Sequence, residues 1–158
     1  MFTTNFSLSQ LDEIIAKHLF PSGVLPVVFY VQGPLGAGKT TLAQALARYL
    51  GIKQEVNSPT FNYVNVYPID AHNRNNPGGV ASFVHFDLYR LSTLAELVNL
   101  GLLDLLMTPA AVVFVEWPEV LLHEFAPTTF SKPVLQLVLA HQLADSTRRN
   151  LTFSKIVE

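Results

Sequence analysis

The sequence predicts an α/β fold with three layers, in which a mostly parallel central sheet has helices on both faces and antiparallel strands at its edges. Short apolar runs of strand length alternate with segments of helical periodicity, an order typical of parallel strands joined by crossover helices. Several of these runs are continuously apolar rather than alternating, as residues 27–31 and 110–115 are. Continuous apolar runs indicate strands that are buried on both faces.

The length and composition predict a soluble single domain over residues 1–158. The chain is 49% apolar and 14% charged, with a net charge of −2 and no cysteine. A disordered chain would need the reverse balance, and disulfide frameworks and Cys-based zinc sites are excluded. Because no apolar run reaches ~18 residues and no signal-peptide pattern is present, we expect a cytoplasmic protein without a membrane segment. The slight acidity argues against an extensive direct nucleic-acid interface.

The first third of the chain contains three expected elements. Residues 9–19 should be helical, because a serine can cap the start and four apolar residues share one face. Pro-Ser-Gly at residues 21–23 then breaks the chain. Residues 27–31 are β-branched and aromatic and predict a buried strand. Residues 40–50 contain good helix formers and are followed by a glycine, which predicts a second helix.

Further strands are expected at residues 61–67, 83–87 and 110–116. Residues 68–82 are rich in Asn, Pro and Gly and predict a flexible loop. A helix is expected over residues 93–106, where leucines nearly encircle the axis. Such a helix is usually deeply buried, and we favour burial over an exposed partner surface.

The end of the chain predicts an antiparallel hairpin. Residues 134–141 and 150–157 are strand-like and flank a polar turn at residues 144–149. The hairpin would add antiparallel strands at one edge of the sheet.

A glycine-rich loop connects the strand at residues 27–31 to the following helix. Its sequence, GPLGAGKT at residues 33–40, satisfies G-x-x-x-x-G-K-[ST]. The glycines let backbone N–H groups turn toward phosphates at the positive end of a helix. Lys39 can bridge the β- and γ-phosphates, and the Thr40 hydroxyl can bind Mg²⁺. The residues predicted to bind a nucleotide are Gly33, Gly36, Ala37, Gly38, Lys39, Thr40, Thr41 and Thr60.

Two apolar strands end in an acid, Asp87 and Glu116. Ligands of open α/β sheets bind beyond the carboxyl ends of the strands, and an acid there is costly unless it meets a cation or hydrogen-bond donors. One acid should coordinate Mg²⁺ and the other should position the attacking water. Sequence order does not decide between them, and ordinary surface acids are the alternative. With Lys39, these are the predicted catalytic residues.

Several weaker candidates have ordinary alternatives. Arg90 follows Asp87 by three residues and could reach a phosphate or a partner, or be a plain surface arginine. Thr60, in the segment Asn-Ser-Pro-Thr at residues 57–60, could sense a γ-phosphate or metal, or could belong to a plain turn. His85 lies inside a strand and is expected to be a core histidine rather than a ligand. Trp117 could cover the site but fits a core edge. Arg148 and Arg149 could flank the adenine, although a solvated turn is favoured for both.

Several motifs together resemble the TsaE (YjeE) family, bacterial P-loop ATPases of tRNA threonylcarbamoyladenosine biosynthesis. They occur in the family's order and comprise GPLGAGKTT at residues 33–41, SPTF at 58–61, HFDLYRL at 85–91 and EWPE at 116–119. The P-loop alone is generic, but HFDLYRL together with EWPE is highly specific. The sequence departs from the family at Pro34, where Asp is usual, and in a longer loop at residues 68–82.

The resemblance implies a compact P-loop sheet and a Mg²⁺-dependent ATPase that is slow alone and is stimulated by partners. ATP and Mg²⁺ are the expected cofactors, and TsaB and TsaD-like proteins the expected partners, through which tRNA is reached indirectly. Thr40 and Glu116 are implied to hold Mg²⁺, Asp87 to be a catalytic acid, and Thr60 to act as a switch.

Two other functions remain open at this point. A small-molecule P-loop kinase would need an acceptor pocket and a lid that carries arginines. Basic residues are sparse, however, and Arg74 is the only arginine or lysine in the loop at residues 68–82. A non-enzymatic nucleotide-dependent regulator would bind ATP without turnover. An Asp87→Ala variant separates these possibilities.

Overall fold

The computed structural model describes residues 2–21, 25–70, 72–73, 75–76 and 78–157. The Ser22–Gly23 part of the expected chain break and the loop residue Arg74 lie outside the described residues. The strands are β1 (Phe2–Ser7), β2 (Val27–Gln32), β3 (Val64–Pro68), β4 (Ser82–Asp87), β5 (Ala111–Glu116), β6 (Val134–His141) and β7 (Arg148–Val157). The helical elements are η1 (Leu8–Gln10), α1 (Leu11–Ile14), η2 (Ile15–Leu19), α2 (Lys39–Tyr49), α3 (Leu94–Asn99), α4 (Leu103–Leu106), α5 (Glu119–Glu124) and η3 (Pro127–Thr129).

The described strands form one seven-stranded sheet in the order β1-β7-β6-β2-β5-β4-β3. The four inner strands from β6 to β4 run parallel, whereas β3, β7 and β1 pair antiparallel at the edges. The predicted α/β class, with a parallel centre and antiparallel edges, is therefore confirmed. In register, Glu116 on β5 pairs with both Val31 on β2 and Asp87 on β4. The carboxyl ends of these three strands consequently meet at one edge of the sheet.

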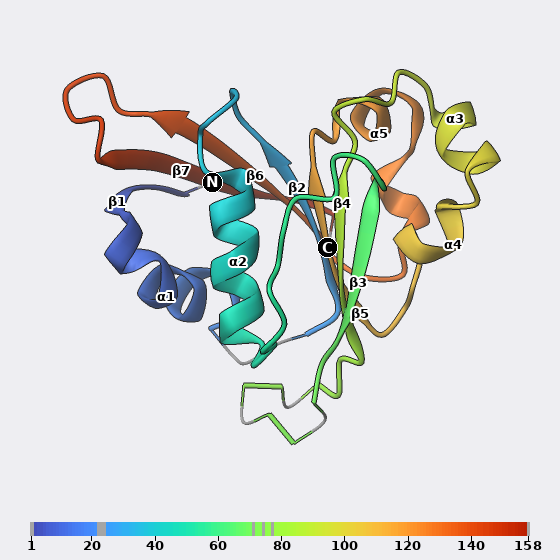
Figure 1. Cartoon of the computed structure of the whole chain (residues 1–158), viewed down its shortest axis with the longest axis horizontal. Helices are drawn as coiled ribbons and strands as arrows, with labels where there is room; N and C mark the ends of the chain where they lie inside the picture. The colour runs from blue at the N-terminus through green and yellow to red at the C-terminus, as the bar shows by residue number, and fades with distance from the viewer. Residues whose placement is uncertain (1, 22–24, 71, 74, 77, 158) are drawn as a thin grey trace.

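Helices cover both faces of the sheet, which gives the three expected layers. The helices α1 and α2 lie on one face, and α3, α4 and α5 lie on the other (Figure 1). All six residues of β5 are buried. Val112 and Phe114 belong to the core under α2, and Val113 and Val115 to the opposite core. This alternation follows from the two-residue period of a strand, and it explains why the central strands are continuously apolar.

The two ends of the chain differ from the prediction because of long-range pairing. The polar β1 was not predicted, since it has no apolar pattern and is held by its ladder with β7. Both strands of the predicted hairpin are present, with β7 beginning at Arg148, two residues earlier than expected. However, β6 also pairs in parallel with β2 and so belongs to the centre of the sheet. Only β7 and β1 form the antiparallel edge on that side.

Local backbone geometry explains three further differences. The helix expected over residues 93–106 is split into α3 and α4 by Gly101, whose φ is 71°. Leu97 and Leu106 are buried, but Leu100 is 49% exposed, so the expected burial holds for only part of the segment. The strand expected from residue 61 begins at Val64, because a turn closes on the Pro59 carbonyl beforehand. The first predicted helix is a short α1 followed by the π-helical turn η2.

The loop between β3 and β4 lies at the end of the sheet opposite the glycine-rich loop (Figure 1). Its Asn75 donates a side-chain hydrogen bond of 2.9 Å to the Tyr49 carbonyl at the end of α2. The buried Asn76 bonds both the N–H and the C=O of Val80 at 2.8 Å. The described part of this loop therefore packs against the helix end and does not reach the strand-end acids. No helix in the described part of the chain is long and apolar enough to cross a membrane.

Candidate functional site

The glycine-rich loop turns between β2 and α2 through residues with positive φ angles. Gly33 has a φ of 146°, and a Cβ placed there would lie 2.4 Å from the Leu139 carbonyl oxygen of β6. Gly38 has a φ of 100° and caps the N-terminus of α2. The first N–H groups of a helix have no partner within it and carry the positive end of its dipole. The loop is therefore shaped to receive an anion above α2.

Lys39 lies inside this loop and is 5% exposed. Its Nζ donates hydrogen bonds to the carbonyls of Gly33 at 2.7 Å and Pro34 at 3.0 Å. The ammonium also lies 3.7 Å from the centre of the Trp117 ring. Burial lowers the pKa of Lys39, and the nearby carboxylates of Glu116, Asp87 and Glu119 oppose that shift. The ammonium thus occupies a desolvated position between the loop and the strand-end acids.

Trp117 follows Glu116 with a backbone φ of 56°. This left-handed conformation costs a bulky residue about 1–2 kcal/mol. It places the indole over Lys39 and 4.9 Å from the ring of Tyr89, measured between ring centres. Trp117 therefore covers the lysine rather than only closing the edge of the core.

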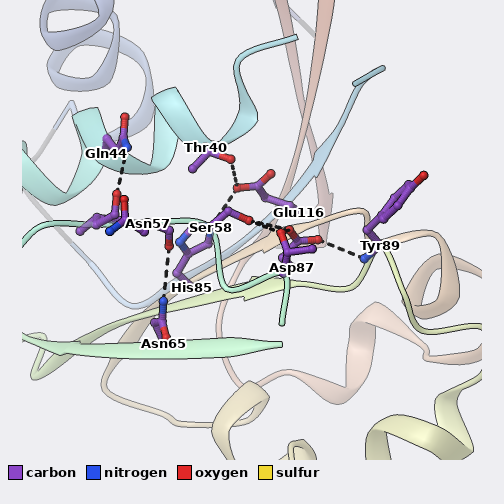
Figure 2. A network of polar contacts seen from close by, with 11 residues as sticks. Thr40, Gln44, Asn57, Ser58, Asn65, His85, Asp87, Tyr89 and Glu116 are labelled. Atoms are coloured by element: carbon purple, nitrogen blue, oxygen red, sulfur yellow. Dashed lines mark hydrogen bonds and ion pairs between the residues drawn. The ribbon is translucent and has the colours of Figure 1, made fainter. Parts of the chain in front are cut away.

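The Thr40 hydroxyl donates a hydrogen bond of 2.9 Å to Oε1 of Glu116 (Figure 2). Neighbouring oxygen ligands of an octahedral Mg²⁺, with bonds of about 2.0–2.1 Å, are also about 2.9 Å apart. The two side chains consequently fit adjacent positions around this ion. The described residues contain no group of three or more His, Asp or Glu side chains suited to a metal. A magnesium ion here would therefore need further ligands from phosphates and water, as is usual for nucleotide-bound Mg²⁺.

Asp87 is 4% exposed and is held by donors from two segments. The hydroxyls of Ser58 and Thr60 each donate to its Oδ2 at 2.7 Å, and the Tyr89 N–H donates to Oδ1 at 3.1 Å. The two hydroxyl oxygens are also 2.7 Å apart. The segment carrying Ser58 and Thr60 therefore lies directly against the second acid, and Figure 2 shows Ser58 in this position.

A cavity of about 270 Å³ joins the loop, the hydroxyl-bearing segment and both acids. It is lined by all of the predicted site residues except Gly33, which backs onto β6, and Ala37. Ser58, Leu35 and Trp117 also line it, although they were not among the predicted site residues. Each lies in a motif that the sequence shows: Ser58 beside Thr60, Leu35 within the glycine-rich loop, and Trp117 directly after Glu116, where it is a candidate cover for the site. Arg90 is not part of the lining and lies 5.3 Å from the exposed ring of Phe61.

A second cavity, of about 500 Å³, adjoins the first at Gly36, Gly38 and Thr41. Ala37 lines it, together with residues of β1, η1 and α1 and the turn between β6 and β7. Arg149 belongs to this lining, although a solvated turn had been favoured for it, and it donates hydrogen bonds to the carbonyls of Ser146 and Arg148. Apart from the glycine-rich loop, no sequence motif marks this cavity, because its other walls come from the two ends of the chain.

A family model and a solved structure each match this chain over most of its length. A family model described as "Threonylcarbamoyl adenosine biosynthesis protein TsaE" matches residues 3–150. The crystal structure of YdiB from Bacillus subtilis superposes with a TM-score of 0.62 at 23% identity, covering 99% of this chain and 86% of that one. This structural likeness shows that the two chains share a fold.

Curated relatives named tRNA threonylcarbamoyladenosine biosynthesis protein TsaE are similar in sequence. The protein from Bacillus subtilis is 35% identical over 150 residues, which is 95% of this chain and 78% of the relative. That from Borreliella burgdorferi is 40% identical over 100 residues, 62% of this chain and 66% of the relative. The match to the Haemophilus influenzae protein covers 52% of it. The chain thus spans about half to two thirds of the length of several curated relatives. The family model and the Bacillus subtilis relative together show that the chain belongs to the TsaE family of threonylcarbamoyl adenosine biosynthesis proteins.

Proposed function

We propose that this protein is a Mg²⁺-dependent ATPase that works in the cytoplasm on TsaB and TsaD-like partners during threonylcarbamoyladenosine modification of tRNA. The observation that carries the ATPase proposal is the convergence of the P-loop, Thr40 and two strand-end acids on one cavity. Family membership supports the pathway. The net charge of −2 supports action on protein partners, because a strong tRNA site needs clustered Lys and Arg.

The nucleotide phosphates would bind above the N-terminus of α2. Lys39 donates hydrogen bonds to two loop carbonyls in this structure. When a nucleotide binds, these would be replaced by hydrogen bonds to the β- and γ-phosphate oxygens. The nucleoside would bind in the larger cavity, which is lined in part by Gly36 and Thr41 of the loop. A bound nucleotide would thereby contact both ends of the chain.

Thr40 and Glu116 would hold the magnesium ion, which supplies positive charge to the phosphates when bound. Asp87 would accept a hydrogen bond from the attacking water and orient it toward the γ-phosphorus. The water oxygen forms the new P–O bond, the bond to the ADP oxygen breaks, and the water proton leaves by way of Asp87 or phosphate. Ser58 and Thr60 would hold the Asp87 carboxylate in place.

Slow turnover by the protein alone is part of this proposal. P-loop enzymes that hydrolyse rapidly use an arginine to stabilise the transition-state charge. No arginine lines the smaller cavity among the described residues, and Arg90 packs on Phe61. A partner would therefore supply the missing stabilisation.

The test is ATP turnover by the purified protein with and without the partner complex and tRNA. We expect low turnover alone, a marked increase with partners, and loss of turnover with retained ATP binding in Asp87→Ala. Phosphate transfer to a small acceptor in place of water would support the kinase alternative. ATP binding without turnover under every condition would support a regulator.

A further inference from the structure

His85 is a fully buried residue of β4 that points at the acid on the neighbouring strand. Its side chain is 0% exposed, and its Nε2 lies 2.9 Å from Oε1 of Glu116. The same carboxylate oxygen accepts the Thr40 hydroxyl bond. Two donors, one from the sheet and one from α2, therefore converge on a single oxygen atom (Figure 2).

The imidazole ring of His85 is held by aromatic neighbours on the same face of the sheet. The Phe83 ring stacks at 6.1 Å and the Phe114 ring meets it edge-on at 5.5 Å, both measured between ring centres. Such packing allows the ring little freedom to rotate. The direction of the Nε2–H bond is therefore set by the core.

The hydrogen-bond pattern assigns the ring proton of His85 to Nε2. A carboxylate can only accept, so Nε2 must donate to Glu116. The other nitrogen, Nδ1, is buried and has no partner among the described residues. An unpaired acceptor at that position is less costly than an unpaired N–H donor, since orphaned buried N–H groups are rare.

We propose that His85 is a positioning residue that holds the Glu116 carboxylate in its magnesium-binding orientation. This inference rests on the proposed function, in which Thr40 and Glu116 bind the ion. When the Thr40 oxygen turns to the ion, its hydrogen bond to Glu116 is lost and His85 remains as the donor. The acid then stays oriented on a rigid strand without having to be reordered at each binding event. Hydrogen-bonded partners of metal-binding side chains typically contribute 10- to 100-fold to metal affinity or activity.

A histidine that only fills space in the core predicts a different outcome. Its replacement would lower stability without changing the response to Mg²⁺. Two variants separate these roles. His85→Gln keeps an N–H donor at the same number of bonds from the backbone, whereas His85→Leu fills the space without a donor. Phe86→Leu is the matched control, because Phe86 is equally buried on β4 but belongs to the opposite core.

The first measurement is ADP affinity by calorimetry, with Mg²⁺ and with EDTA. In His85→Leu we expect the Mg²⁺ concentration that gives half of the maximal increase in ADP affinity to rise about 10- to 100-fold. The ADP affinity measured in EDTA should be unchanged. His85→Gln should recover most of this loss, and Phe86→Leu should lose thermal stability only. The proposal is overturned if His85→Leu responds to Mg²⁺ like the wild type, if His85→Gln gives no recovery, or if affinity in EDTA falls by the same factor.

The second measurement needs neither nucleotide nor metal. Nitrogen-15 NMR of labelled histidines in the free protein should show the His85 proton on Nε2, with that resonance shifted in Glu116→Ala. A proton on Nδ1 would overturn the proposal. If the ADP affinity of the wild-type protein does not change with Mg²⁺, the proposed function is refuted instead. The NMR result then still decides whether His85 holds Glu116.

Discussion

Replacing Gly33 with alanine tests whether the shape of the P-loop depends on its contact with β6. Gly33 combines a φ of 146° with a close approach to the sheet, since an added Cβ would meet the Leu139 carbonyl oxygen at 2.4 Å. That oxygen belongs to backbone that pairs with β7, so it cannot move without disturbing the ladder. Gly79 is a matched control, because it also has a positive φ, of 62°, but has open space around its Cβ position.

The expected cost in folding free energy is the sum of two effects. A side chain in a backbone region reserved for glycine costs of order 1–3 kcal/mol. Overpacking against a rigid neighbour adds about 1–3 kcal/mol. The Gly33→Ala variant should therefore lose about 2–6 kcal/mol of stability. Gly79→Ala bears only the first effect, about 1–2 kcal/mol for a left-handed residue.

The assay is urea unfolding followed by circular dichroism, combined with ADP calorimetry. We expect Gly33→Ala to unfold at clearly lower urea than Gly79→Ala and to lose most of its nucleotide affinity. If the two variants lose equal stability, or if Gly33→Ala binds ADP like the wild type, the close approach to β6 does not control the loop.

Three further predictions concern single side chains. The buried hydroxyl of Tyr30 has no partner among the described residues and burial raises its pKa, so Tyr30→Phe should raise the unfolding free energy by about 1 kcal/mol in thermal melts. Burial lowers the pKa of Lys132 from 10.5 to about 8. Between pH 8 and 10.5 the unfolded state binds more protons than the folded state, so the unfolding free energy of the wild type should rise with pH. The rise should be roughly 3 kcal/mol relative to Lys132→Met, measured by urea unfolding at both ends of this pH range. Ser58→Ala removes one of the two hydroxyl groups that donate to Asp87 and should lower partner-stimulated ATP turnover about tenfold. The ADP affinity, measured by calorimetry, should stay within about a factor of two of the wild type. Unchanged turnover would show that the Thr60 hydroxyl alone holds Asp87 in place.

Much of the candidate site could be predicted from the sequence because its parts are local. The loop motif joins β2 to α2 within a few residues, and glycine most readily adopts the positive φ angles that this loop contains. Asp87 and Glu116 could be identified because each ends a mainly apolar strand, and parallel strands bring their carboxyl ends to one edge. The prediction that these acids lie together therefore needed only the order of elements.

The missed features come from residues far apart in the chain. Nothing in a polar stretch such as β1 identifies it as a strand, since its ladder with β7 joins opposite ends of the sequence. The parallel pairing of β6 with β2 was missed for the same reason. The larger cavity, which includes Arg149, exists only because these two pairings bring both chain ends to the loop.

The sequence by itself determined the class of fold, the family and the phosphate-binding loop, because these depend on local backbone preferences and on motifs of fixed spacing. Only the tertiary structure decided which side chains contact each acid. The pairing of β4 with β5 places His85 against Glu116, and a shift of one residue would turn His85 to the other face of the sheet. Strand register depends on how the whole sheet packs, and no single segment of sequence specifies it.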